Sequence, residues 1–457
     1  MLRIITKMLL RIKENNPSIF TIEKIIYYLV VVTGFFGVAL FSVNLGVFTM
    51  FPFRFFLLLL WIIFLGHILV KRRKIDFQKN KIQRYFIFLV FWLGYALLSL
   101  TWSASFAPAI RNVLFLFMGI SLIFFSFYYL KEVADFQKIQ WIWFAVFSIL
   151  VVLGFWEHLT GQHLLLSRYY GETSRHLMFR PTGIFLNQND YATFLALSIP
   201  IAISLFRKEN KRLSRFLAME MVTGAMYLIV ITGSRANILA VILELILFLF
   251  ILKFKQKMRL ILELFVCMLI LMIFLSVPMQ GIFLQTVREI GSIVNDAKVA
   301  SDEKTVVTKE ITVNISSMNS RVNLIKNGIS FLLSKAGFGV GPGNFEYYMS
   351  NFAIYDTKNG SNSHNWWLEI LVNYGIIIFI GYTIFYFSLI LKLGKIYYRK
   401  ISGNEKRICE GFLVSLVGFS FASLGPSSII AFKPHWLLFA FALAFLNYIL
   451  NKEETQV

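Results

Sequence analysis

The sequence predicts an all-α polytopic membrane protein with about twelve transmembrane helices. Hydrophobic residues make up 58% of the 457 residues, aromatic residues make up 17%, and the mean hydropathy is +0.69. A soluble domain of this length cannot hide so much apolar surface, because it must present a polar exterior. Many apolar runs also reach about 20 residues, the length at which a helix crosses a hydrocarbon core of roughly 30 Å.

The apolar runs divide the chain into three predicted parts. Helices 1–9 occupy residues 1–279, a large external loop occupies 280–366, and helices 10–12 occupy 367–457. The loop is too long for a simple connection, which favours a function for it, and part of it is predicted to be helical. The predicted spans are residues 25–45, 51–70, 85–101, 112–130, 140–156, 184–206, 216–232, 236–252, 260–279, 367–391, 409–424 and 434–450.

The distribution of basic residues predicts the orientation. If the N-terminus is cytoplasmic, the cytoplasmic segments carry about two thirds of the 45 Lys and Arg residues, although the external segments hold more loop sequence. Because Lys and Arg resist translocation, both termini are predicted to be cytoplasmic and the large loop external. The net charge of +21 therefore belongs mainly to cytoplasmic loops. We expect no nucleic-acid partner, because no soluble segment combines a basic patch with interleaved aromatic residues.

A very short turn joins the seventh and eighth predicted spans. Its sequence, "TGSRAN" at 232–237, holds Arg235 near the external membrane surface with little freedom. An arginine costs about 2.5–3.5 kcal/mol at the bilayer centre on insertion scales, but less near the interface. Two interpretations stay open for Arg235: a stop between two helices, and an arginine that binds an anion.

Polar residues open the sixth predicted span. The stretch "FRPTGIFLNQNDYATFLAL" at 179–197 contains Arg180, Asn187, Asn189 and Asp190, the last three placed one to two turns into the apolar run. Polar side chains entering a membrane helix together must face protein or water. They predict either hydrogen bonds between helices or a polar pocket for a hydroxyl-rich substrate.

The large loop contains a predicted amphipathic helix that begins near Arg321. Ser320 or Asn319 is a candidate cap for its start, and the glycine-rich segment 337–343 ends it. These glycines do not form a dinucleotide-binding motif, because no strand precedes them. They are expected to let the backbone approach a ligand or membrane headgroups. The apolar face of the helix is predicted from residues 322, 325, 329 and 332.

His364 closes the large loop within "SNSHNWWLEILVNYG" at 361–375. Asn365, two tryptophans and Glu369 follow it, and the next apolar run begins there. An interfacial anchor is one interpretation, since aromatic residues gather at membrane surfaces. A catalytic base is the other, because a neutral imidazole accepts protons near pH 7.

Other polar residues carry weaker signals. The external loops contain no Asp-x-Asp pair, so we expect neither a metal nor another cofactor, and a bound diphosphate would be neutralised by arginine. His158, His163 and His176 lack metal-ligand spacing. Glu244 and Glu263 lie one per helix and are expected to form hydrogen bonds between helices, although a proton-relay role stays open.

These motifs, in this order, resemble the O-antigen ligase and O-antigen polymerase superfamily of bacterial surface-polysaccharide assembly. The matching pieces are "RPTGIFLNQNDYA", "TGSRA", "SRVNLIKNGISFLLSKAGFGVGPGNF" and "HNWWLEILVNYG". They lie between residues 180 and 380, and the predicted topology extends the resemblance over most of the chain. One departure is that Leu324 and Ile325 stand where the family often has tryptophan.

The resemblance implies a glycosyltransferase in the cell membrane with its active site on the external face. It implies an undecaprenyl-diphosphate-linked glycan as donor, a glycan, lipid or wall component as acceptor, and no metal. Arg235 and Arg321 match arginines expected to stabilise the leaving diphosphate, and attack opposite that group implies inversion. His364 matches the expected base, and Asn365 completes the His-Asn pair.

Glu369 is expected to orient His364, and Arg180, Asn187, Asn189, Asn365 and Glu369 are the candidate substrate-binding residues. Besides membrane lipids, the expected partners include a flippase and a chain-length regulator. Capsule, O-antigen and teichuronic-type polymers are all candidate products. The sequence does not distinguish a ligase from a polymerase. A secondary transporter of a polar solute and an assembly scaffold are the alternatives.

Overall fold

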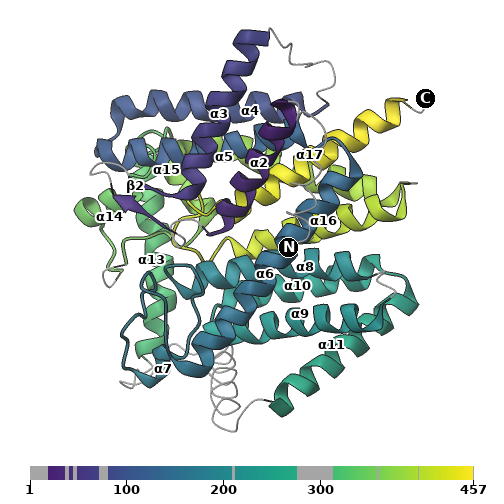
Figure 1. Cartoon of the computed structure of the whole chain (residues 1–457). Helices are drawn as coiled ribbons and strands as arrows, with labels where there is room; N and C mark the ends of the chain where they lie inside the picture. The colour runs from purple at the N-terminus through teal and green to yellow at the C-terminus, as the bar shows by residue number, and fades with distance from the viewer. Residues whose placement is uncertain are drawn as a thin grey trace.

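The computed structural model describes residues 19–36, 41–44, 49–71, 81–207, 211–274, 312–357, 360–399 and 401–455. Long helices dominate these residues (Figure 1), which confirms the predicted mainly helical membrane fold. One small addition is an antiparallel pair of two-residue strands, β1 (Val43–Asn44) and β2 (Thr49–Met50).

Each predicted span overlaps a helix, but the first, residues 25–45, also extends over β1, and residues 275–279 of the ninth lie outside the described residues. Eight helices in the described part of the chain are long and apolar enough to cross a membrane: α3, α4, α5, α6, α8, α9, α15 and α17. The twelve-span count and the orientation stay predictions. The helices are α2 (Ile19–Phe36), α3 (Pro52–Lys71), α4 (Gln83–Leu98, continued by the 3-10 turn η2, Ser99–Trp102), α5 (Phe106–Tyr129), α6 (Val133–Thr160), α8 (Gln188–Phe206), α9 (Arg212–Thr232), α10 (Arg235–Ile251), α11 (Phe254–Phe274), α15 (Trp366–Tyr398), α16 (Gly403–Ala422) and α17 (Lys433–Thr455).

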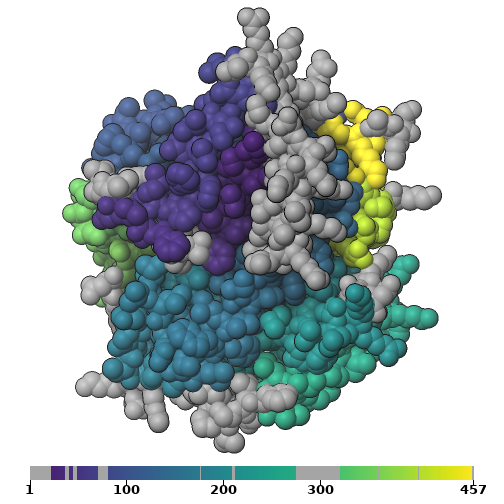
Figure 2. Space-filling model, viewed as in Figure 1, coloured from purple at the N-terminus to yellow at the C-terminus, as the bar shows by residue number. Residues whose placement is uncertain are grey.

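Helices α8, α16 and α17 form the centre of the bundle. The apolar windows of α8 and α17 are 83% buried, whereas that of α3 is only 22% buried, so α3 lies at the periphery. Small residues let α16 approach α8: Ser415 Oγ donates to the Leu197 carbonyl (2.8 Å), and a Cβ at Gly411 would collide with Ser204. Such contacts matter because lipid tails give apolar helices no hydrophobic reason to associate. The space-filling view shows the purple N-terminal helices above the teal segment that follows them (Figure 2).

The two membrane-helix glutamates differ in their partners. Glu263 on α11 forms an ion pair with Arg215 on α9 (2.7 Å), which confirms its predicted bond between helices. The same prediction for Glu244 is wrong. Its carboxylate is fully buried against Gly418 of α16, and neither oxygen has a hydrogen-bond partner among the described residues.

The described part of the large loop contains α13 (Thr312–Ser334) and α14 (Phe345–Phe352). Because α13 already begins at Thr312, the predicted cap at Asn319 or Ser320 is wrong. Ser320 Oγ instead donates to the Thr357 carbonyl (3.0 Å). The amphipathic character is confirmed. Of the four apolar positions predicted for its face, only Leu332 is buried within the protein, whereas Val322, Ile325 and Ile329 are exposed. The buried face consists of Leu324, Asn327, Gly328, Phe331 and Leu332.

The glycine-rich segment packs against a break in α15. Gly375 has φ 80° and ψ 177°, which interrupts the helix and frees its backbone groups. The segment uses them: Val340 N donates to Val372 O (2.8 Å), and Ile376 N donates to Gly337 O (2.9 Å). The expectation that these glycines approach a ligand or headgroups is therefore wrong. They allow two backbones to touch, and thereby fix the loop to the start of α15.

Candidate active site at one end of the bundle

The N-terminal ends of α8, α10 and α15 meet at one end of the bundle, together with α13 and the loop between α6 and α8. In Figure 1 this end lies at the left, where α7 (Arg175–Met178), α13 and α14 gather, while the C-terminus lies at the right. Every residue that the sequence predicts for the site belongs to these elements. Chain segments far apart in sequence therefore build one site.

Arg235 is the first residue of α10. Gly233 ends α9 with φ 70°, and Ser234 occupies the position before the next helix, so the turn leaves Arg235 at a helix start. The guanidinium of Arg180 lies beside this turn, because a Cβ at Gly233 would stand 3.7 Å from Arg180 Nη1. Two predicted arginines thus lie next to one another at the end of α9.

Electrostatic interactions connect Arg235, Arg321 and His364. The pKa of Arg321 is lowered for two reasons. Nearby protein atoms displace some of the water around its guanidinium, and the positive charge of Arg235 adds a smaller effect. The pKa of His364 is lowered first by burial and then by Arg321 and Arg168. Arg321 is therefore close enough for its charge to interact with both of the other predicted catalytic residues.

Backbone carbonyls orient the His364 ring. His364 has φ 44°, a left-handed conformation that is uncommon outside glycine and often found at functional sites. Its Nδ1 faces the carbonyl of Gly425 at 3.3 Å. A carbonyl only accepts hydrogen bonds, so Nδ1 carries the proton and Nε2 keeps its lone pair. The ring is held in the tautomer that a general base requires.

The connection between α16 and α17, residues 423–432, links the helix ends around the site. Gly425 lies against the start of α10, since a Cβ there would stand 3.3 Å from Asn237 Nδ2. Ser428 Oγ donates to Glu369 (3.0 Å), and Ser423 O accepts from Trp366 N (3.1 Å). Glu369 is therefore bonded to this connection, and the described contacts include no hydrogen bond between Glu369 and His364; its orienting role stays a prediction. Sequence reasoning missed the connection, whose only signal is the turn sequence "GPSS" at 425–428.

The predicted asparagines begin helices. Asn187 caps α8, with Oδ1 accepting from the backbone N–H groups of Asn189 (2.9 Å) and Asp190 (3.0 Å). Its Nδ2 donates to Ser427 in the 423–432 connection (2.8 Å). These residues thus stand at the helix start, not one to two turns inside it. Asn365 caps α15 in the same way, through the N–H groups of its first turn. Both side chains position the backbone at the site.

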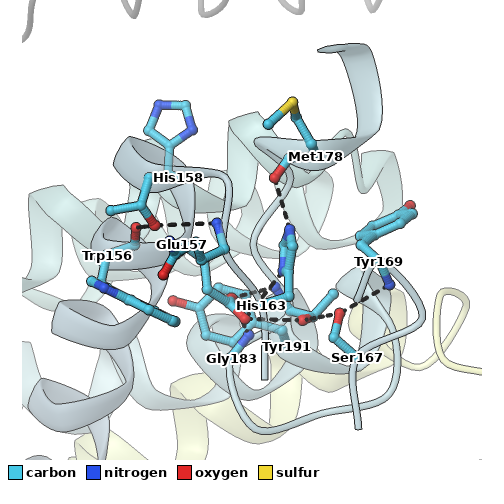
Figure 3. A network of polar contacts seen from close by, with 12 residues as sticks. Trp156, Glu157, His158, His163, Ser167, Tyr169, Met178, Gly183 and Tyr191 are labelled. Atoms are coloured by element: carbon cyan, nitrogen blue, oxygen red, sulfur yellow. Dashed lines mark hydrogen bonds and ion pairs between the residues drawn. The ribbon is translucent and has the colours of Figure 1, made fainter. Parts of the chain in front are cut away.

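A buried network around Glu157 shapes the loop between α6 and α8 (Figure 3). The Glu157 carboxylate accepts from the backbone N–H groups of Thr182 (2.8 Å) and Gly183 (2.6 Å), and His163 Nδ1 lies 3.2 Å from it. His163 Nε2 donates to Met178 O (2.7 Å), so both ring nitrogens face acceptors. Burial opposes protonation, but these bonds raise the pKa of His163 overall. His158 bonds Phe179 O and Tyr227 in the same loop region.

The same loop carries Arg168, an arginine that sequence reasoning missed. Tyr169 is buried next to it; burial raises the Tyr169 pKa, and the charges of Arg168 and Arg180 oppose that rise. Arg168 and Arg180 therefore flank one tyrosine, and Arg168 also acts on His364. The available signal was an arginine beside two tyrosines in a loop predicted to be external. In the ranges that the structure describes, no group of three or more His, Cys, Asp or Glu side chains could hold a metal ion.

The lowered pKa of His364 predicts the pH dependence of any reaction in which it is the base. The ring must be neutral, so activity should persist below the ordinary pKa of 6.5 and fall as pH drops through the lowered value. Arg168→Gln removes a positive charge, which raises the pKa of His364 and moves this fall to higher pH. A pH profile of kcat/KM tests it, with Lys326→Gln as the control. An unmoved profile in Arg168→Gln would contradict it.

Comparison with known proteins agrees with the motifs. A family model described as O-antigen ligase matches residues 220–383, which include Arg235, Arg321 and His364. The teichuronic acid biosynthesis protein TuaE of Bacillus subtilis (strain 168) is 31% identical over 437 residues, covering 94% of this chain and 85% of that protein. The chain therefore belongs to the O-antigen ligase and O-antigen polymerase superfamily, whose members act in bacterial surface-polysaccharide synthesis.

Proposed function

We propose that this protein transfers a glycan from an undecaprenyl-diphosphate carrier to an acceptor hydroxyl on the external face of the membrane. The similarity to a teichuronic acid biosynthesis protein supports a polymer of the teichuronic type as the product. In this proposal the protein acts as a polymerase, so that the acceptor is another glycan chain. The proposed catalytic residues are Arg235, Arg321 and His364.

The observation that carries this proposal is that the charge of Arg321 interacts both with Arg235 and with His364, which come from different elements. The positive charges of Arg235 and Arg321 disfavour one another, as the lowered pKa of Arg321 shows. A bound diphosphate would offset this repulsion, because guanidinium groups pair with phosphate oxygens. Burial, and then the charges of Arg321 and Arg168, lower the pKa of His364 and so favour the neutral ring that a base requires.

The reaction follows from this placement. The acceptor hydroxyl oxygen forms a bond with the anomeric carbon while His364 Nε2 takes its proton. The bond between the anomeric carbon and the phosphate oxygen breaks, and its electron pair stays on the diphosphate. Arg235 and Arg321 stabilise the charge that develops there, and they stabilise it more in the transition state than in the ground state. Attack from the face opposite the diphosphate inverts the anomeric carbon.

Charge-removing and charge-keeping variants test the arginines. Arg235→Ala and Arg321→Ala should each lower transfer about 10²–10³-fold, as expected for loss of one group that stabilises developing charge. Arg235→Lys should recover part of that loss, because it restores the charge but not the forked geometry. Lys326→Ala is the control, since Lys326 lies exposed on the same helix as Arg321. The measurement is release of undecaprenyl diphosphate from a lipid-linked oligosaccharide in reconstituted vesicles.

The products of this assay separate the two family activities. A polymerase should give a ladder of chain lengths from the donor alone, whereas a ligase should need a separate acceptor. Full activity of both alanine variants would disprove the proposed roles. A wild-type protein that releases no carrier diphosphate with any acceptor would disprove the function itself.

A further inference from the structure

A second basic site lies at the opposite end of the bundle. A cavity of about 540 Å³ opens there among the C-terminal ends of α8 and α10 and the N-terminal ends of α9, α11 and α16. Helix α8 has 19 residues, so this cavity and the candidate active site are separated by roughly 28 Å of helix. The distribution of Lys and Arg predicts that the cavity faces the cytoplasm. Its lining includes Arg207, Arg212, Arg215, Arg259, Arg407 and Glu263.

In the part of the chain that the structure describes, arginines outnumber acids around the cavity. Arg207 pairs with the buried Glu410 (2.7 Å). Arg215 and Arg259 share one carboxylate oxygen of Glu263, at 2.7 and 3.0 Å. Among the described residues, five arginines line the cavity, and these two acids are the carboxylates with which three of them form ion pairs. Such an excess around a concave space attracts anions.

Backbone groups add to this positive potential. Arg212 is the first residue of α9, and Lys211 before it makes no side-chain capping hydrogen bond. Gln256, in the first turn of α11, also lines the cavity. Helix N-termini carry partial positive charge and unpaired N–H groups, so both favour an anion. In addition, Arg207 Nε is buried and has no hydrogen-bond acceptor among the described residues.

We propose that this cavity binds an anion with two phosphate groups. The volume lies within the range of small-molecule sites, about 300–1,000 Å³, and exceeds what a single phosphate needs. Guanidinium groups are the side chains best suited to phosphate oxygens. A free diphosphate and the headgroup of a two-phosphate lipid share this chemistry. The position at the ends of membrane helices lets either source reach the cavity.

Thermal stability of the purified full-length protein tests the proposal without any glycan-transfer assay. One arm titrates inorganic pyrophosphate into protein in neutral detergent. The other compares phosphatidylcholine vesicles with and without cardiolipin, a lipid with two phosphates. The test variant is Arg212→Gln with Arg407→Gln, because neither arginine belongs to the ion pairs with Glu263 and Glu410. Arg84→Gln, an exposed arginine at the start of α4, is the matched control.

We expect a saturable rise in Tm with at least one probe for the wild type and for Arg84→Gln. The double variant should need at least tenfold more probe for the same rise. A response to cardiolipin alone identifies a lipid ligand, and a response to pyrophosphate identifies a soluble one. Equal responses of the double variant and the wild type would overturn the proposal. So would a wild type that responds saturably to neither probe.

Discussion

His364→Ala is expected to lower glycan transfer about 10²–10⁴-fold, the range that a positioned general base contributes. The loss should appear in kcat, because the ring acts on the proton of the attacking hydroxyl. The hydrogen-bond partner of the ring is a carbonyl group of the 423–432 connection, so the variant is expected to remain folded. The measurement is the rate of undecaprenyl diphosphate release, with the far-UV spectrum and Tm as checks of folding.

His364→Gly separates catalysis from backbone strain. The φ of 44° suits glycine, so the glycine variant should be about 1 kcal/mol more stable than the alanine variant. Both should be equally inactive, because neither can take a proton. Transfer by the alanine variant above one tenth of the wild-type rate would eliminate His364 as the base. A glycine variant less stable than the alanine variant would contradict the strained conformation.

Gly339→Ala is expected to destabilise the protein by more than about 3 kcal/mol, because it combines two costs. The residue has φ 84°, which disfavours a side chain, and an added Cβ would lie 2.6 Å from Gly375 N and 2.8 Å from Asn373 O. These are backbone atoms that cannot rotate away, so the contact between the glycine-rich segment and α15 must open. Denaturation of the reconstituted protein measures the loss.

Gly94→Ala is the matched control for this prediction. Gly94 lies in α4 with no atom within 4 Å of an added Cβ, so the change should leave stability within about 1 kcal/mol of the wild type. Transfer by Gly339→Ala should fall along with stability, because α15 carries the site at its start. A variant that keeps wild-type stability would show that the two backbones do not pack as closely as described.

Helix positions could be predicted from apolar runs, since a membrane chain must satisfy its backbone hydrogen bonds within each helix. The break at Gly375 could not, because a single glycine in an apolar run looks like a packing residue. What opens the helix is the backbone of residues 337–343, and only tertiary structure brings that segment to it. For the same reason the residues of α13 that pack inside the protein could not all be predicted, since they contact α14 and α15, which are distant in sequence from its start.

Some residues of the candidate site could likewise be predicted from the sequence, and others could not. Arg235, Arg321 and His364 stand in motifs whose order could be read directly, and the structure brings them together. Arg168 and Gly425 could not be predicted, because an exposed loop arginine and a turn glycine have ordinary neighbours in sequence. Their importance comes from contacts with residues more than fifty positions away. Such contacts depend on how the helix ends converge.

The carbonyl that anchors His364 has a consequence for genetics. In many enzymes an acidic side chain orients the histidine, so a single substitution can remove the anchor. Here the partner is the main-chain carbonyl oxygen of Gly425. Any residue type at position 425 would present the same oxygen. Substitution scans will therefore underrate this interaction. Insertions and deletions in the 423–432 connection, which move the oxygen itself, are the changes to which the protein should be most sensitive.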